Sequence, residues 1–509
     1  VRLRGFSLGQ AGDIYVDGLR DAPLIERDTF NQDRVEVLKG SASMLFGKGS
    51  TGGVVNQVSK RAFLMDQHEV NTLAGSGNEW RVTGDFNLVT GENAALRMNL
   101  MRHSAYNQGA KLDKEGVALD YRWGIGLRDE YEVSFYHLET NGRPQYIQRW
   151  LLNGNTIKPM LPAKNYYGLS TDRLNTDADY LTLAHTHRFD DGGQLTTRLR
   201  HGHYERDLWG SVVGFASGTT IANFSNATEI TRQAKGRLAE SDVTQAQSDY
   251  SRKFTAWGYA HELLSGVDVF EEKASRANSH AGTSESWRTT VGQPNLDSYT
   301  LSNPVRQSRG TPTYTHFTSR SVGGYVQDTV SLTDTVKLVG GLRWDRFIAA
   351  YRTTTTGLVR AENLWSPRLG VLYQPDADQS FYASYGSSYN MSGDAYQFTP
   401  SVPNSAEART PAEKSRNFEV GTKQEVFGKK ATLGVAWFWS EKYNERNKDP
   451  DSAATEYLLS GKRHATGFEF NLAGRFTPQW EVFYNHTWIP EALIDHMNGA
   501  TATGNRPRT

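Results

Sequence analysis

The sequence has no cysteine among its 509 residues, and its formal net charge is zero because 56 Lys and Arg residues balance 56 Asp and Glu residues. The lack of cysteine excludes a disulfide framework, a catalytic thiol and a zinc–thiolate centre. The neutral balance argues against a nucleic-acid-binding protein, which usually carries excess positive charge. We therefore expect no nucleic-acid partner.

Long apolar segments are also absent. Mean hydropathy is −0.60, and no apolar run approaches the roughly 20 residues that a membrane helix needs. The chain starts at "VRLRGF" without a recognisable signal peptide. Aromatic residues nonetheless make up 11% of the chain, with 24 Tyr and 12 Trp. Two classes fit this composition: a soluble β protein, or an outer-membrane barrel whose strands turn half of their residues toward a polar interior.

From about residue 68 onward, the sequence is a series of alternating segments of roughly ten residues, which is the period of a barrel strand. In segment 335–347, Leu338 and Leu342 lie on one face of a predicted strand, and Arg343 and Asp345 lie on the other. Side chains alternate across a strand, so each such segment has one apolar and one polar face. The same alternation is found in 417–427 and 431–440.

The connections between these segments separate the two classes. The short turns are 90–93, 190–193, 332–334, 375–378, 427–430 and 476–479, and the long polar connections are 141–176, 208–245, 273–316, 390–413 and 490–509. Short turns at one end and long loops at the other are typical of an outer-membrane barrel, where closure also removes exposed strand edges. About 17 strands fit before residue 489, and because bacterial barrels usually have an even number we expect a chain truncated at both ends.

The stretch "FGKGSTGGVVNQVSKR" (46–61) contains the spacing G-x-G-x-x-G. A dinucleotide-binding turn follows a strand and opens a helix. Here a predicted helical turn, 41–46, comes before the glycines and a β-branched predicted strand comes after them, so we expect no nucleotide site. Tight turns with positive φ, or close backbone approach, explain such glycines better. They are Gly40, Gly47, Gly49, Gly52 and Gly53.

Residues 1–63 depart from the barrel pattern. They carry "LRGF", "IYVDGLRD" and "RDTFNQDRVEVLKGSASMLFGKGSTGGVVNQVSKR". This stretch resembles the second half of the plug domain of TonB-dependent siderophore receptors, most closely the ferric-catecholate type. The motifs "NFEVGTK" (417–423), "KRHATGFEFNLAG" (462–474) and "TGNRP" (503–507) are similar to the barrel of the same family.

The resemblance implies an all-β membrane protein, a 22-stranded antiparallel transmembrane β-barrel with an N-terminal plug domain in its lumen. About 17 of those strands are present here. Residues 1–63 would be the C-terminal part of the plug domain, with the five glycines in its turns, and residues 64–509 a barrel that is incomplete at its C-terminus.

The same resemblance implies a receptor in the outer membrane of a Gram-negative bacterium that binds and actively imports a ferric siderophore of the catecholate type. Energy would come from TonB, with ExbB and ExbD, through an N-terminal segment that this sequence lacks. We expect a monomer surrounded by outer-membrane lipid, with no enzyme activity and no cofactor, because the ferric siderophore is cargo. The alternatives are another cargo (ferric hydroxamate, haem or cobalamin), or a passive porin or adhesin.

Arginines in the predicted apical loop of the plug, 18–28, are candidates for ligand contact. A ferric tris-catecholate is a trianion with aromatic rings, and arginine offers both charge-assisted hydrogen bonds and stacking. The candidates are Arg20 and Arg27 of this loop, together with Asp21 beside them and Arg4 of the earlier "RGF" turn. The alternative is that the arginines form ordinary loop salt bridges with Asp21, Glu26 and Asp28.

Aromatic residues of the long connections form a second group of candidates for siderophore contact. They are Tyr146, Trp150, Tyr166, Tyr167 and Trp209. Tyr and Trp also form the girdles at membrane interfaces, so loop packing or a girdle position is the alternative for each.

Glu419 and Glu469 fall on the polar faces of their predicted strands. The family resemblance implies that these wall glutamates form ion pairs with basic plug residues, here Arg34 and Lys39 of "RVEVLK". Lysine at position 39, where arginine is common in the family, would lose bidentate geometry. The alternative is that both glutamates face lumen water.

The histidine pairs "HTH" (185–187) and "HGH" (201–203) each share one strand face. No carboxylate or cysteine at matching sequence spacing completes a tetrahedral ligand set. We therefore expect no metal site in the protein.

Overall fold

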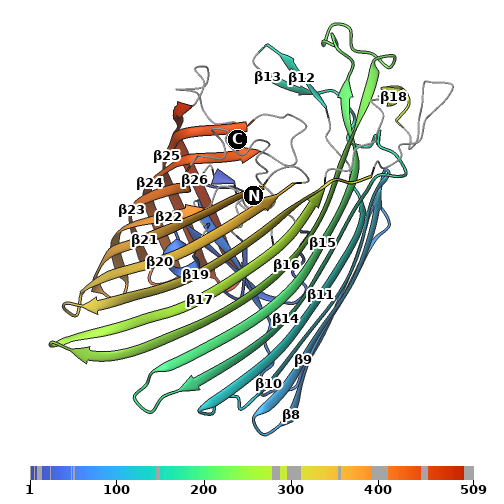
Figure 1. Ribbon diagram of the computed structural model, residues 1–509. Helices are drawn as coiled ribbons and strands as arrows, with labels where there is room; N and C mark the ends of the chain where they lie inside the picture. Colours follow the sequence, from blue (N-terminus) through green and yellow to red (C-terminus); the bar gives the residue numbers. More distant parts are fainter. Residues whose placement is uncertain are drawn as a thin grey trace.

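The computed structural model describes residues 2–4, 6–7, 14–22, 25–47, 49, 52–144, 149–154, 156–277, 287–294, 311–353, 357–390, 411–448 and 457–497. Nearly all of the regular structure is β (Figure 1). Among the described residues, no helix is long and apolar enough to cross a membrane.

Seventeen long antiparallel strands of the described chain form one sheet that curves into a barrel. They are β7 (Gln67–Gly75), β8 (Glu79–Gly91), β9 (Ala94–Asn107), β10 (Ala110–Trp123), β11 (Asp129–Arg143), β14 (Arg173–Arg188), β15 (Gln194–Phe215), β16 (Glu229–Ala256), β17 (Tyr259–Ala277), β19 (Tyr314–Ser331), β20 (Val336–Arg352), β21 (Gly357–Asp376), β22 (Gln379–Asn390), β23 (Glu413–Val426), β24 (Ala431–Lys448), β25 (Tyr457–Thr477) and β26 (Trp480–Met497). Each pairs with the next along the chain, and β17 pairs directly with β19. The predicted all-β barrel is confirmed.

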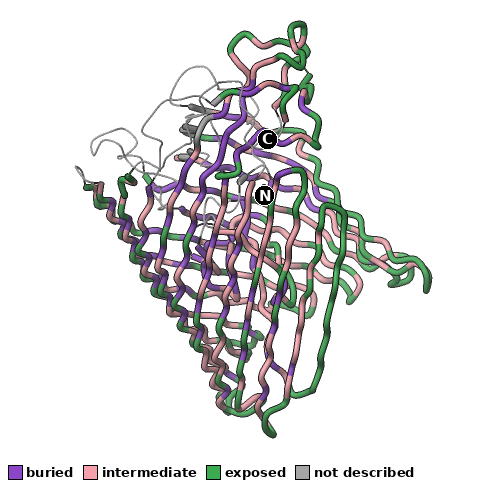
Figure 2. Tube along the Cα trace, turned by 90° about the vertical axis from the view of Figure 1, so that its right-hand side faces the viewer, coloured by how far each residue is buried: buried purple, intermediate pink, exposed green. Residues whose placement is uncertain are grey.

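The first and the last wall strands along the chain, β7 and β26, are the least packed part of the sheet. In the strand order around the barrel, β26 is next to β7. All nine residues of β7 are exposed, and most of β26 is exposed as well. Much of the rest of the wall alternates between more and less exposed residues along its strands (Figure 2).

The two ends of the barrel differ as the sequence predicts. All six predicted short turns join strands at one end, here called the turn end. At the opposite end, the loop end, the chain forms the hairpin of β12 (Trp150–Asn153) and β13 (Thr156–Pro159) and the short strand β18 (Trp287–Thr290), which pairs with β16. The prediction that residues 208–245 form a long loop is wrong. Most of these residues extend the paired strands β15 and β16 beyond the other strands (Figure 1).

The alternation of faces follows the prediction on β20. Leu338 and Leu342 are 41% and 43% exposed and point outward, whereas Arg343 and Asp345 are buried and point inward. An apolar exterior with a polar interior suits a wall that faces lipid on one side and a filled lumen on the other.

The lumen holds a small four-stranded sheet with the order β4-β3-β6-β5. Its strands are β3 (Ile14–Val16), β4 (Leu19–Arg20), β5 (Gln32–Lys39) and β6 (Gly53–Ser59). The one-turn helix α1 (Ser43–Phe46) lies between β5 and β6, as predicted, and β1 (Arg2–Leu3) pairs with β2 (Phe6–Ser7). We call this luminal unit the plug.

Glycines shape the turns around α1. Positive φ angles occur at Gly40 (+83°), Gly47 (+78°), Gly49 (+104°) and Gly53 (+142°). The carbonyl of Gly52 accepts a hydrogen bond from the Gly40 amide at 3.1 Å. A Cβ added at Gly53 would lie 2.4 Å from the Leu38 carbonyl oxygen, so no other residue fits there without a shift of the backbone.

Candidate functional site

The plug meets strands β22 to β25 through buried charges. Arg4, between β1 and β2, donates from Nη2 to Glu419 Oε2 at 2.5 Å and to Glu469 Oε2 at 3.0 Å, and from Nε to Glu469 Oε1 at 3.2 Å. Its guanidinium carbon lies 4.2 Å from the centre of the Phe438 ring on β24. Burial lowers the pKa of Arg4, but the hydrogen bond to Glu469 and the charge of Glu419 raise it above its ordinary value. One plug cation is thus shared by two wall carboxylates.

The predicted basic partners of these glutamates behave differently from each other. Lys39 Nζ lies 3.3 Å from Glu469 Oε1. The Arg34 side chain is 57% exposed and pairs with Asp33 and Glu36 of the plug. The prediction that Arg34 pairs with a wall glutamate is therefore wrong. Positions 34 and 39 are an odd number of residues apart and fall on opposite faces of one strand. Arg4, which the sequence suggested for ligand contact, takes the place expected of Arg34.

Small polar residues extend this contact along α1. The Ser43 amide donates to Ser388 Oγ at 3.2 Å, and the Gly49 amide donates to the Tyr389 carbonyl at 2.7 Å. Ser41 Oγ lies 3.2 Å from Ser415 Oγ and also accepts a hydrogen bond from the side-chain amide nitrogen, Nδ2, of Asn417. We call the contacts of Arg4, Lys39 and residues 41–49 with β22 to β25 the polar flank.

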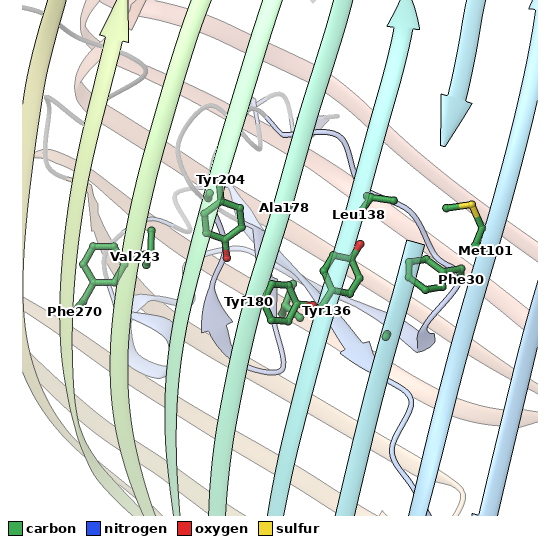
Figure 3. Packing of buried hydrophobic residues seen from close by; sticks show 12 residues of the cluster. Phe30, Met101, Tyr136, Leu138, Ala178, Tyr180, Tyr204, Val243 and Phe270 are labelled. Atoms are coloured by element: carbon green, nitrogen blue, oxygen red, sulfur yellow. The ribbon is translucent and has the colours of Figure 1, made fainter. Parts of the chain in front are cut away.

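The opposite side of the plug packs against aromatic rings on β11, β14 and β15 (Figure 3). Phe30 of the plug stacks on Tyr136 with ring centres 5.7 Å apart, and Tyr136 stacks on Tyr180 at 4.6 Å. Val16, Ala22 and Phe30 share a buried cluster with Tyr204, Val243 and Phe270 of the wall. We call this contact the aromatic flank.

Two buried charged contacts accompany the aromatic flank, and the sequence reasoning missed both. Arg200 donates to the Val16 carbonyl at 3.0 Å and to Asp17 Oδ2 at 3.1 Å, with its guanidinium carbon 4.5 Å from the Tyr180 ring centre. Asp28 accepts two hydrogen bonds from Arg81, at 2.5 and 3.0 Å. Burial raises the pKa of Asp28, but Arg81 outweighs that effect and lowers it below its usual value. An arginine on the inward face of β15 was the available signal for Arg200.

The predicted apical loop of the plug is braced by its own side chains. Arg27 donates to Asp21 Oδ2 at 2.8 Å and to the Ile25 carbonyl at 3.2 Å, which is the loop salt bridge that the alternative described. Arg20 is buried, and its backbone exchanges two hydrogen bonds with Gln245 of β16, at 3.0 and 2.6 Å. The Arg20 guanidinium carbon lies 5.8 Å from the Phe270 ring centre.

The candidate aromatics of the loop end differ in exposure. Trp150, at the start of β12, is 46% exposed. Tyr166, Tyr167 and Trp209 are buried, and the Tyr167 hydroxyl donates to the Val291 carbonyl at 2.9 Å. Tyr146 lies outside the described residues. Burial removes three of these rings from the surface that a ligand would meet.

Carboxylates that sequence spacing does not reveal lie beside both histidine pairs. Asp129 stands beside His185 and His187, and Asp242 stands beside His203. Neighbouring strands supply these carboxylates, so spacing along the sequence does not reveal them. The register of the paired strands brings the groups together, because Asp129 is opposite His187 and Asp242 is opposite His203.

The comparisons with known proteins agree with this architecture. Residues 120–509 match the family model described as TonB dependent receptor-like, beta-barrel, and residues 1–54 match the TonB-dependent Receptor Plug Domain. The catecholate siderophore receptor Fiu of Escherichia coli K12 is 24% identical, covering 94% of this chain and 67% of that protein. The probable TonB-dependent siderophore receptor PiuA of Acinetobacter baumannii is 25% identical, covering 96% of this chain and 68% of that protein.

Solved structures share the fold. The crystal structure of PiuA from Acinetobacter baumannii superposes with a TM-score of 0.85 at 22% identity, over 99% of this chain and 76% of that one. The closed form of Fiu from Escherichia coli K12 superposes with a TM-score of 0.83 at 21% identity, over 98% of this chain and 75% of that one. The barrel, the luminal plug and the matched families together place the chain in the outer membrane of Gram-negative bacteria as a member of the TonB-dependent receptor family.

Proposed function

We propose that this protein imports a ferric siderophore across the outer membrane, using energy delivered by TonB with ExbB and ExbD. The observation that carries the proposal is the way in which the plug is held. It lies in the lumen, and its polar flank rests on hydrogen bonds and ion pairs that can be exchanged for water, centred on Arg4, Glu419 and Glu469. A plug held in this way closes the pore at rest and can still separate from the wall.

We propose that the polar flank is the side that separates. Charged and hydroxyl contacts are strong only in a narrow geometry, so a pull that shifts the plug slightly removes several of them together. The aromatic flank also has directional contacts, from Arg200 and Arg81, but its apolar contacts depend chiefly on buried area and so weaken less when the plug shifts. The plug would then rotate against β11 to β15 while a path opens along β22 to β25.

The proposed cargo is a ferric catecholate. The catecholate siderophore receptor Fiu supports this choice by its name, whereas PiuA is named only as a probable TonB-dependent siderophore receptor. In this proposal the exposed ring of Trp150 contacts the anionic, aromatic chelate, and Arg20, Arg27 and Asp21 shape the apical loop beside Phe270. Iron arrives already chelated, so the protein needs neither a cofactor nor a catalytic residue, and we propose that it works as a monomer in outer-membrane lipid.

The proposed domain boundary lies between residues 63 and 64. The last plug strand ends at Ser59 and the first wall strand begins at Gln67. Binding outside must change the exposure of the TonB contact inside, so the two sites are coupled through the plug. A passive porin would need an open lumen, and the plug contacts with the wall on both flanks favour the transporter over that alternative.

Uptake of radioactive ferric catecholate by cells that express the receptor, with and without TonB, tests the transport proposal. We expect saturable uptake that disappears when TonB is deleted, while binding to whole cells persists. Uptake that continues without TonB would contradict active transport. Quenching of Trp fluorescence by ferric hydroxamate and not by ferric catecholate would keep the transporter and replace the cargo.

A further inference from the structure

Three potential metal-binding side chains meet on the outer surface of the barrel at its turn end, away from the plug. They are Asp129, the first residue of β11, and His185 and His187, near the end of β14. One ligand atom from each lies within 4.8 Å of the others. Neither the plug contacts nor the proposed transport step uses these residues.

The register of β11 and β14 brings the three groups together. Asp129 is directly opposite His187, and Tyr131 is opposite His185. Histidines two residues apart project from the same face of a strand. Both imidazoles reach one carboxylate oxygen, because Asp129 Oδ1 lies 2.9 Å from His185 Nε2 and 2.7 Å from His187 Nδ1.

These distances are close to those of a metal site. Zinc-type ions bind imidazole nitrogen and carboxylate oxygen at about 2.0–2.2 Å, which separates neighbouring ligand atoms by about 3.3 Å in tetrahedral geometry. Each imidazole would move away from the carboxylate oxygen by about half an ångström, and the two imidazole nitrogens, now within 4.8 Å of each other, would adopt a similar spacing. The protons that now link these atoms would be displaced by the ion.

Aromatic neighbours hold both imidazole rings in place. His185 stacks on Tyr131 with ring centres 4.6 Å apart at 13°, and Tyr131 stacks in turn on Trp123 at 5.3 Å. His187 meets the ring of Phe189 edge-on at 4.6 Å. A ligand set held in position loses little side-chain entropy when it binds an ion.

The group lies at the surface of the wall, and the nearby basic side chains have their own partners. The side chains of His185, His187 and Asp129 are 42%, 24% and 40% exposed. Arg128 lies 3.5 Å from Asp190, and Arg188 lies 2.7 Å from Glu130. These two arginines are therefore paired away from Asp129.

We propose that Asp129, His185 and His187 form a binding site for a divalent transition-metal ion of the zinc, nickel or copper type. Two imidazole nitrogens select such ions over magnesium and calcium, which prefer oxygen ligands. The bound ion links β11 to β14 across the turn end and stabilises the folded wall by mass action. Two other groups in the described chain, Glu115 with His137 and Glu139, and His203 with Glu240 and Asp242, each offer only one imidazole.

Titration of Zn²⁺ alone into the detergent-solubilised receptor, stripped beforehand with EDTA and followed by calorimetry, tests the site. We expect one ion to bind at micromolar or lower concentration, and the Kd to rise at least about tenfold in Asp129→Asn and in His187→Ala, each of which removes one of the three ligands. Millimolar Mg²⁺ should not displace the zinc.

His201→Ala is the matched control, because His201 is also an exposed histidine of a barrel strand but contacts Thr244. It should leave zinc binding unchanged. Thermal unfolding in EDTA shows whether each variant folds, and added zinc should raise the midpoint of the wild type and not that of Asp129→Asn. Equal zinc binding by wild type and both site variants, or an equal loss in His201→Ala, would overturn the proposal.

Discussion

The two flanks of the plug hold the same small sheet by different chemistry. On the polar flank, Arg4 is enclosed by two carboxylates and the Phe438 ring. On the aromatic flank, Phe30 lies against Tyr136 within an apolar cluster. A buried ion pair adds little net stability, because desolvation offsets the attraction, but removal of one partner leaves a charge buried without compensation. Apolar packing contributes roughly in proportion to its area.

This difference explains how one interface can be both tight and releasable. The polar flank depends on complete sets of partners, so it tends to be either intact or lost. The aromatic flank tolerates small rotations, because stacked rings keep most of their contact when they slide. Three substitutions and one pH dependence test this contrast. A cross-link tests its consequence for transport.

The largest effect is expected from Arg4→Ala. Glu469 is 4% exposed, and after the substitution it keeps only the contact with Lys39. We expect a loss of about 4 kcal/mol of unfolding free energy, within the range for removing one partner of a buried ion pair. Chemical unfolding of the receptor in detergent measures it. Arg34→Ala, at an exposed arginine paired within the plug, is the control and should leave the midpoint unchanged.

Phe30→Ala tests the aromatic flank. The side chain is buried, and its removal leaves a cavity beside Tyr136. We expect a loss of about 3 kcal/mol, typical of a large apolar side chain removed from a core. The same substitution at Phe427, which is 64% exposed at the turn end, serves as the control. A Phe30→Ala loss below that of the control would show that the aromatic flank does not hold the plug.

Gly53→Ala tests how rigidly the plug sheet connects the two flanks. The φ of +142° and the close Leu38 carbonyl leave no room for a Cβ. We expect a cost of about 2 kcal/mol, as for other strained backbone positions. Gly324→Ala is the control, since a Cβ there would have open space. Equal stability of the two alanine variants would mean that the turn before β6 adjusts easily.

Asp172 at the loop end is a buried carboxylate held by hydrogen bonds, and it can be compared with the ion-paired carboxylates of the polar flank. It accepts hydrogen bonds from Ser211 Oγ at 2.9 Å and from the Leu169 amide at 3.1 Å. Burial raises the pKa of Asp172 to about 6. A raised carboxyl pKa favours the protonated form in the folded state, so stability increases as the pH falls from 7 to 5 and is lost again as the pH rises. The expected gain is about 1.3 kcal/mol.

The measurement for Asp172 is thermal or chemical unfolding of the loop end at both pH values. Asp172→Asn should remove the pH dependence, because its side chain does not titrate. A wild-type stability that falls between pH 7 and pH 5, with the asparagine variant unchanged, would reverse the assigned direction.

Local sequence pattern predicted the wall and missed its long-range partners. The two-residue period located the strands, and the short polar turns located the turn end, because both signals lie within about ten residues. The partners of Arg4 are 415 and 465 positions away, so the sequence offered only a choice among basic residues. Asp129 is 56 positions from His185 and is aligned with it only by strand register.

Two errors have separate causes. Residues 208–245 are polar enough to be interpreted as a loop, yet β15 and β16 pair with each other through Phe215 and Ile230. Tyr166, Tyr167 and Trp209 were grouped with Trp150 by residue type, but three of the four rings pack inside the loop end. Composition does not distinguish a ring that faces a ligand from one that faces its neighbours.

A disulfide across the polar flank tests the central claim most directly. The chain has no cysteine, and Ser41 Oγ lies 3.2 Å from Ser415 Oγ, so the pair Ser41→Cys and Ser415→Cys can be oxidised and reduced without side reactions at other thiols. Iron uptake is measured in cells with the pair oxidised and then reduced, and each single variant serves as the control. The account predicts that oxidation stops uptake, leaves siderophore binding unchanged, and is reversed by reduction. Normal uptake through a fully cross-linked receptor would contradict it.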